Sequence, residues 1–144
     1  MKLIKYHWEL DVYKLAVEAA MKVFELTKTF LVEERYSLTD QVRRSSRSTS
    51  AQIAEAWRRR KYEGVFVNKL NESEGEAAET LGWLEYGVKC GYLSRSSAKE
   101  LHNMYDLIIG KLVIMGNNPA RWLMDKSKAS PDSLTHFPTH SPTR

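Results

Sequence analysis

The chain has 144 residues, of which 42% are hydrophobic, and its 22 basic and 18 acidic side chains give a net charge of +4. This length and apolar content are typical of one compact domain. No apolar run approaches the ~18 residues of a membrane span, and the start MKLIKYHWELD lacks a signal-peptide hydrophobic stretch, so we expect a cytoplasmic protein that has no membrane contact.

The first helix is predicted from about Glu9 to Phe30, within a stretch of helical periodicity that no proline interrupts before Pro119. Its apolar residues form two adjacent stripes: Val12, Leu15, Ala16, Ala19, Val23 and Leu26, and beside them Leu10, Tyr13, Val17, Met21 and Phe24. A surface helix of a monomer normally shows one stripe, so the second indicates a subunit interface. Alternatively, Trp8, Tyr13 and the region of Trp122 cover one another within one chain.

The second helix is predicted over the segment from Leu38 to Lys61, with Ser37 or Thr39 as its N-cap, and it has two chemically opposite faces. Its apolar side comprises Leu38, Val42, Thr49, Ile53 and Ala56. The opposite arc forms a cationic strip roughly 22 Å long at about 1.5 Å rise per residue. We predict that nucleic acid binds to the basic residues of this helix, which are Arg43, Arg44, Arg47, Arg58, Arg59, Arg60 and Lys61.

Positive charge is concentrated in this part of the chain. Residues 35–61 hold eight Lys and Arg against Asp40 and Glu55, for a net charge of +6, so the remainder of the +4 chain sums to −2. A clustered positive field steers anionic partners, and neutralisation of phosphates is the sequence-independent part of nucleic-acid affinity. Alternatively, the run from Arg58 to Lys61 only solvates a helix C-terminus, where cations also suit the helix dipole.

The third helix is predicted from about Tyr62 to Lys89, with Gly91 as its end. Its apolar face comprises Phe66, Leu70, Ala77, Leu81, Leu84 and Val88, and the opposite face carries Glu72, Glu76 and Glu79. A di-metal site in a bundle usually needs Glu-x-x-His pairs, and no histidine here follows a glutamate at that spacing. We therefore expect no metal site, and carboxylates that either pair with basic residues of another helix or subunit or are solvated.

The fourth helix is predicted to begin after Ser94, which with Ser97 offers N-cap hydroxyls, and to end at Gly116. Its apolar stripe is Leu101, Met104, Tyr105, Ile108, Leu112 and Met115. Four helices with short connections predict an all-α fold, an antiparallel up-and-down four-helix bundle over residues 1–116. Residues 117–144, rich in Ser, Thr and Pro, are predicted to be a largely disordered tail, in which residues 121–124 either dock onto the bundle or share the disorder.

Signatures of catalysis are missing from the sequence, which has no Gly-rich phosphate loop and no nucleophile elbow. We expect no catalytic residue, no cofactor and no enzyme activity. The four serines of the second helix, Ser45, Ser46, Ser48 and Ser50, are interpreted as small residues that permit close helix contact or as hydrogen-bond donors to phosphate. The single cysteine, Cys90, excludes an internal disulfide and is expected to fill space in a helix.

Three segments resemble one protein family: LDVYKLAVEAAMKVFELTK, ERYSLTDQVRRSSRSTSAQIAEA and LNESEGEAAETLGWLEYGVKCGYLS. The family comprises the four-helix bundle proteins encoded within intervening sequences of bacterial large-subunit ribosomal RNA genes, the S23-type proteins, which are related to the accessory variability proteins of diversity-generating retroelements. The resemblance covers roughly residues 9–115. Its most specific positions are Leu38, Thr39, Gln41, Arg43, Arg44, Ser48, Ile53, Ala54 and Glu55. The family often has Pro, Asn and Gly where Ser50, Gln52 and Ala56 stand, so its usual mid-helix irregularity is not expected here.

The resemblance implies a bundle that assembles as a homopentamer with a basic surface and, as in the retroelement relatives, binds RNA or DNA and a reverse transcriptase. Only Arg43 and Arg44 of the basic candidates match family positions, and the others come from the charge argument. We therefore predict a non-enzymatic homo-oligomer that binds nucleic acid, structured RNA above all, through the second helix. One alternative is an accessory factor that docks a reverse transcriptase or another enzyme of a mobile element, and another is a purely structural oligomer.

Overall fold

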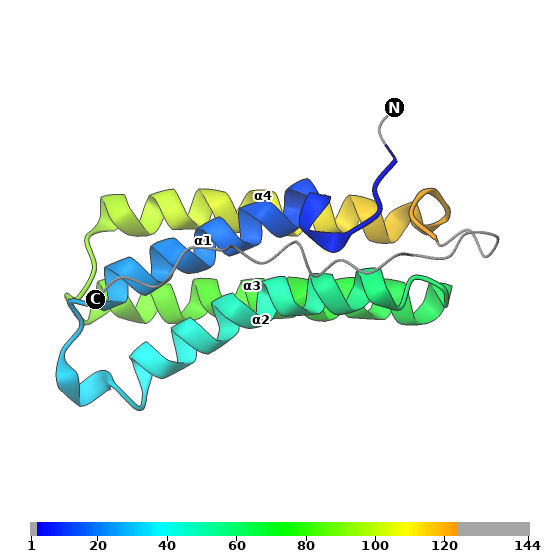
Figure 1. Cartoon of the computed structure of the whole chain (residues 1–144). Helices are drawn as coiled ribbons and strands as arrows, with labels where there is room; N and C mark the ends of the chain where they lie inside the picture. Colours follow the sequence, from blue (N-terminus) through cyan, green and yellow to red (C-terminus); the bar gives the residue numbers. More distant parts are fainter. Residues whose placement is uncertain (1–2, 124–144) are drawn as a thin grey trace, which may run out of the picture.

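The computed structural model describes residues 3–123, and this part of the chain forms four α-helices and three short 3-10 turns. The α-helices are α1 (Asp11–Thr27), α2 (Leu38–Arg58), α3 (Glu63–Lys89) and α4 (Arg95–Asn117). The turns are η1 (His7–Glu9), η2 (Val32–Glu34) and η3 (Pro119–Arg121). Consecutive helices run in opposite directions (Figure 1), which confirms the antiparallel up-and-down bundle.

Helices α1 and α4 form one layer of the bundle, and α2 and α3 form the other (Figure 1). The predicted apolar stripes meet between these layers. The largest apolar side chains that are fully buried there are Tyr105, Phe66, Ile53, Leu70, Leu101, Ile108 and Leu112. Burial of each such side chain contributes about 1.5–3 kcal/mol, so this core is the main source of stability.

The contact between α2 and α3 is built from small polar residues. Ser73 donates to the backbone oxygen of Thr49 at 2.7 Å, and Thr80 donates to the hydroxyl of Ser45 at 2.8 Å, with all four residues fully buried. Pairing both hydroxyls avoids the cost of burying polar groups without partners. The interpretation of the serines as small contact residues is thus confirmed for Ser45, whereas the periodicity of α3 gave no signal for Ser73 and Thr80.

Three helix ends have the terminal residue that the sequence predicts, although α1 ends at Thr27 and α2 at Arg58, before the predicted Phe30 and Lys61. The Ser94 hydroxyl accepts from the backbone of Ser97 at 3.1 Å, as expected for an N-cap. Gly91 ends α3 with a φ of +78°, a conformation that suits glycine. Ser37 stands at the start of α2, but its hydroxyl donates to the Glu34 carboxylate, which also accepts from the Leu38 backbone. Ser37 is thus the N-cap residue, as predicted, but its hydroxyl does not cap the helix because it donates to a carboxylate of the preceding turn.

Helix α2 is continuous from Leu38 to Arg58, as expected from the residues at which the sequence departs from the family pattern. The prediction for Cys90 is wrong, because α3 ends one residue earlier and leaves this side chain exposed at the C-cap. Docking is confirmed for the described part of the segment 121–124, since Trp122 and Leu123 pack against the core.

Residues 124–144 lie outside the described part, so the division into bundle and tail stays a prediction. None of the described helices is long and apolar enough to cross a membrane.

Candidate nucleic-acid interface

Arg43, the first of the predicted basic residues, turns back toward α1. Its Nε donates to the hydroxyl oxygen of Thr27 at 2.8 Å, and its guanidinium lies over the ring of Phe24, 4.8 Å from the centroid. Thr27 is buried, and Arg43 is itself half-buried. A hydrogen bond from a charged donor together with a cation–π contact holds this side chain in place. Arg43 therefore joins α2 to α1 and presents little of its charge outward.

Arg44 turns the other way, toward α3. Its guanidinium pairs with Glu76 at 3.5 Å and with Glu79, and the Glu79 carboxylate also accepts from the indole nitrogen of Trp83 at 3.1 Å. Two carboxylates surround one guanidinium, so this part of the surface has no excess positive charge. The interpretation that the α3 glutamates pair with basic residues of another helix is confirmed here.

Arg47 and Arg58 behave differently. Both side chains are exposed, and neither makes a hydrogen bond or an ion pair with any other residue between positions 3 and 123. They stand eleven residues apart on α2, which corresponds to about 16 Å along the helix axis. The structure thus leaves these two predicted residues available for an anionic partner.

The remaining predicted residues follow at the turn between α2 and α3. Arg59 is 57% exposed and lies 3.9 Å from Glu55, a distance at which an exposed ion pair contributes little. Lys61 is exposed, with its Nζ 5.5 Å from the ring centroid of Tyr62. Arg60 is half-buried over the ring of Trp57, at 3.9 Å, and donates to the Trp57 backbone oxygen at 2.7 Å. Burial and the nearby charge of Arg58 lower the pKa of Arg60.

A further arginine that the sequence did not indicate reaches the same place. Trp57 contacts Trp122 edge to face at 6.2 Å, and the guanidinium of Arg121 lies over Trp122 at 5.1 Å. The two indoles thus connect Arg60 at the end of α2 with Arg121 on η3. We call the set Arg58, Arg59, Arg60, Lys61 and Arg121 the basic corner. Arg121 could be assigned to this set only from the contact between Trp122 and Trp57, which the sequence does not indicate.

The second apolar stripe of α1 is partly covered within the chain. Leu10 is buried, Tyr13 contacts His7 edge to face at 4.7 Å, and Phe24 lies beneath Arg43. Val17 and Met21 remain 36% and 53% exposed. On α4, Leu107 and Ile114 are also exposed. The single chain therefore leaves apolar side chains of α1 and α4 in contact with water.

These features define an all-α, up-and-down bundle with a cationic helix end. Residues 8–113 match the family model of the 23S rRNA-intervening sequence protein, so the chain belongs to this family. A solved structure is similar: a protein with unknown function from the S23 ribosomal protein family of Bacteroides thetaiotaomicron, 29% identical, with a TM-score of 0.68 over 74% of this chain and 96% of that chain. No curated protein matches. The family resemblance of the sequence is confirmed.

Proposed function

We propose that the protein is a non-enzymatic, homo-oligomeric bundle that binds structured RNA through Arg47 and the basic corner. The observation that carries the proposal is the division of the arginines. Arg43 and Arg44, in the first half of α2, are covered or neutralised by the bundle, whereas Arg47, Arg58, Arg59 and Lys61 keep exposed charge. Exposed, unneutralised cations are the groups that release counterions when they meet phosphates.

The spacing of these cations suits a polyanion. Arg47 and Arg58 are about 16 Å apart along α2. A nucleic-acid duplex carries one charge per about 1.7 Å of its axis, so a strip of this length faces several phosphates at once. A small anionic ligand would need its cations convergent around one point, and the positions of Arg47 and Arg58 on the helix do not converge.

Homo-oligomerisation, as a homopentamer, is the second part of the proposal. The exposed apolar residues of α1 and α4, including Met21 and Ile114, support a subunit contact, because exposed apolar patches mark interaction surfaces. Repetition of a weak cationic site on one rigid body raises the overall affinity through effective concentration. Five copies of the basic corner would therefore bind a folded RNA more tightly than any single copy.

The test is the light-scattering mass after size exclusion, with and without a structured RNA, at two salt concentrations. We expect the mass of a homopentamer, and a further increase with RNA at low salt that the triple variant Arg58→Glu, Arg59→Glu, Lys61→Glu loses. A monomer whose mass is indifferent to RNA would contradict both parts. An oligomer that ignores RNA would support only the alternatives, an accessory factor that docks a reverse transcriptase or another mobile-element enzyme, or a structural assembly.

A further inference from the structure

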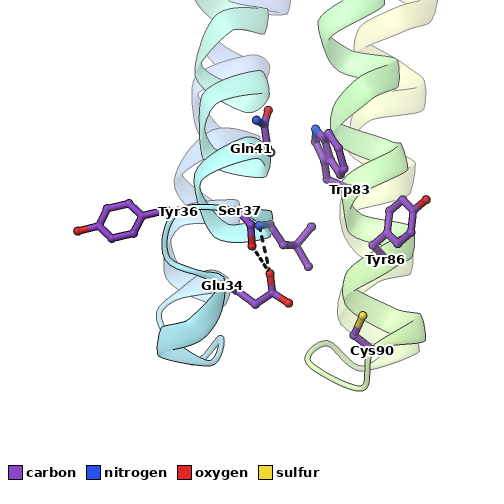
Figure 2. Close-up of a pocket in the computed structure, with 8 residues that line it drawn as sticks. Glu34, Tyr36, Ser37, Gln41, Trp83, Tyr86 and Cys90 are labelled. Carbon is purple, nitrogen blue, oxygen red and sulfur yellow. Dashed lines mark hydrogen bonds between the residues drawn. The ribbon is translucent and has the colours of Figure 1, made fainter.

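A pocket of about 390 Å³ lies at the opposite end of α2 from the basic corner, between the start of α2 and the end of α3 (Figure 2). Its lining residues are Glu34, Tyr36, Ser37, Leu38, Gln41, Trp83, Tyr86 and Cys90. In Figure 2 the ring of Tyr36 points away from α3, Trp83 stands on the side of α3 that faces Gln41, and Tyr86 stands one turn further along α3 with its ring turned away from α2. The pocket therefore has an aromatic wall on α3 and a mixed wall on α2.

The aromatic wall is held in place before any ligand binds. The indole N–H of Trp83 donates to Glu79 at 3.1 Å, and Arg44 anchors that carboxylate from the other side. The rings of Trp83 and Tyr86 lie 5.9 Å apart at an interplanar angle of 36°. Tyr86 is 58% exposed. One aromatic ring held by a hydrogen bond, with a well-exposed second ring beside it, is thus available to a group that enters the pocket.

The pocket has the opposite charge from the basic corner. Glu34 is the one charged residue among those that line it, and Glu33 beside it is exposed. The Glu34 carboxylate accepts from the Ser37 hydroxyl at 2.5 Å, from the Leu38 backbone at 3.3 Å and from the Tyr92 hydroxyl at 2.9 Å. These hydrogen bonds lower the pKa of Glu34, so it is ionised at neutral pH. A carboxylate has about four acceptor positions, which leaves one for a ligand.

We propose that this pocket binds the guanidinium or ammonium group of a basic side chain from a partner protein. The cation would lie against the aromatic wall of Trp83 and Tyr86 and donate to the open position on Glu34. Cations are attracted to aromatic faces within about 6 Å of the centroid, and a carboxylate strengthens the attraction. A phosphate group would be repelled by the same carboxylate, so charge complementarity argues against nucleic acid at this end.

The surroundings of the pocket fit a protein partner. Leu31, Val32 and Tyr36 precede α2 and are 53%, 64% and 85% exposed. Exposed apolar side chains beside a pocket for one anchoring side chain mark a candidate protein-interaction surface. The proposal does not rest on RNA binding, because it uses none of the residues of the basic corner.

The test is a titration of the whole protein followed by the NMR signal of the Trp83 indole N–H, assigned with Trp83→Phe. The probes are N-acetylarginine amide and N-acetylcitrulline amide, which has nearly the same shape but no charge. We expect the arginine probe to shift the signal and the citrulline probe to bind about tenfold more weakly. Equal binding of the two probes, or no shift with either, would overturn the proposal.

Two variants and one control locate the contact. Glu34→Gln keeps hydrogen-bond acceptors for the start of α2 and should weaken the arginine probe about tenfold. Glu33→Gln removes the same charge beside the pocket and should change the affinity less than about twofold. If Glu34→Gln fails to fold, Tyr86→Leu leaves that carboxylate intact and should weaken the probe about threefold. If a nucleoside monophosphate shifts the Trp83 indole signal at a lower concentration than the arginine probe does, the pocket binds a nucleobase and the proposal is wrong.

Discussion

The first half of α2 and its C-terminal end carry the same residue type in different surroundings. In the first half, Arg43 hydrogen-bonds Thr27 of α1 and Arg44 pairs with Glu76 and Glu79 of α3. At the end, Arg58 has no partner among residues 3–123, and Arg59 has only a long contact with Glu55. The difference shows that the arginines of one helix divide into a set of contacts between helices and a set of exposed charges. The neighbouring helices decide which arginine does which.

The largest effect should come from reversing charge at the end of α2. We expect Arg58→Glu, Arg59→Glu, Lys61→Glu to lower affinity for a structured RNA about 100-fold or more at low salt, because each lost phosphate contact removes counterion release. Fluorescence anisotropy with labelled RNA measures this. The matched control reverses Lys28, Lys89 and Lys99, which give the same change in net charge. They stand at the end of α1, at the end of α3 and near the start of α4, and these helix ends lie at the other end of the bundle (Figure 1). Equal losses in the two triple variants would mean that only net charge matters.

The free energy of unfolding should depend on Arg43 more than on Arg58, which is the reverse of the order expected for RNA affinity. We expect Arg43→Ala to lower the free energy of unfolding by about 1–2 kcal/mol, through loss of the charged hydrogen bond to Thr27 and of the stacking on Phe24. Arg58→Ala should stay within about 0.5 kcal/mol of the unmodified protein, since this side chain is exposed and makes no hydrogen bond or ion pair with any residue between positions 3 and 123. Chemical denaturation at one fixed protein concentration gives both values. A larger loss for Arg58→Ala would break the distinction.

Arg44 should show an intermediate, smaller effect. Its guanidinium is 46% exposed, so Arg44→Gln is expected to cost about 0.5 kcal/mol, partly from repulsion between Glu76 and Glu79. Its affinity for RNA should remain within about twofold, because the two carboxylates already neutralise this charge. The same denaturation and anisotropy measurements apply. An RNA loss as large as that of the end variants would mean that Arg44 leaves its carboxylates to bind phosphate.

The smallest effect concerns the first turn of α2. The pKa of Glu34 is lowered in the folded protein by hydrogen bonds from Ser37, Tyr92 and the Leu38 backbone. A lowered carboxyl pKa contributes stability above the unfolded value, near 4.5, and that stability is lost as pH falls through the folded value. In Glu34→Gln the free energy of unfolding should therefore fall less steeply below pH 4.5 than in the unmodified protein. Its pH dependence above 4.5 should be unchanged. Denaturation at several acid pH values tests this, and an unchanged acid slope would contradict it.

The bundle could be predicted from sequence because apolar residues recur at helical spacing in each helix and mark the face that is buried. The stripe of α4, from Leu101 to Met115, is a case in which pattern and burial agree. The roles of the arginines could not be predicted the same way. Arg43 depends on Thr27, sixteen residues earlier, and Arg121 reaches the basic corner through two indoles. Arg44 is the exception. The sequence shows carboxylates on one face of α3 and arginines on α2, so an ion pair between the two helices could be expected.

The assignment of RNA binding to the end of α2 is tested most directly by the salt dependence of affinity. We would measure it for the unmodified protein, for Arg58→Gln, Arg59→Gln, Lys61→Gln, and for Arg43→Gln, Arg44→Gln. The slope of log affinity against log salt should fall by about 2–3 for the first variant and by less than about 1 for the second, since each phosphate contact contributes about 0.7–0.9. A larger fall for the Arg43 and Arg44 variant would place the nucleic acid on the first half of α2 and contradict this account.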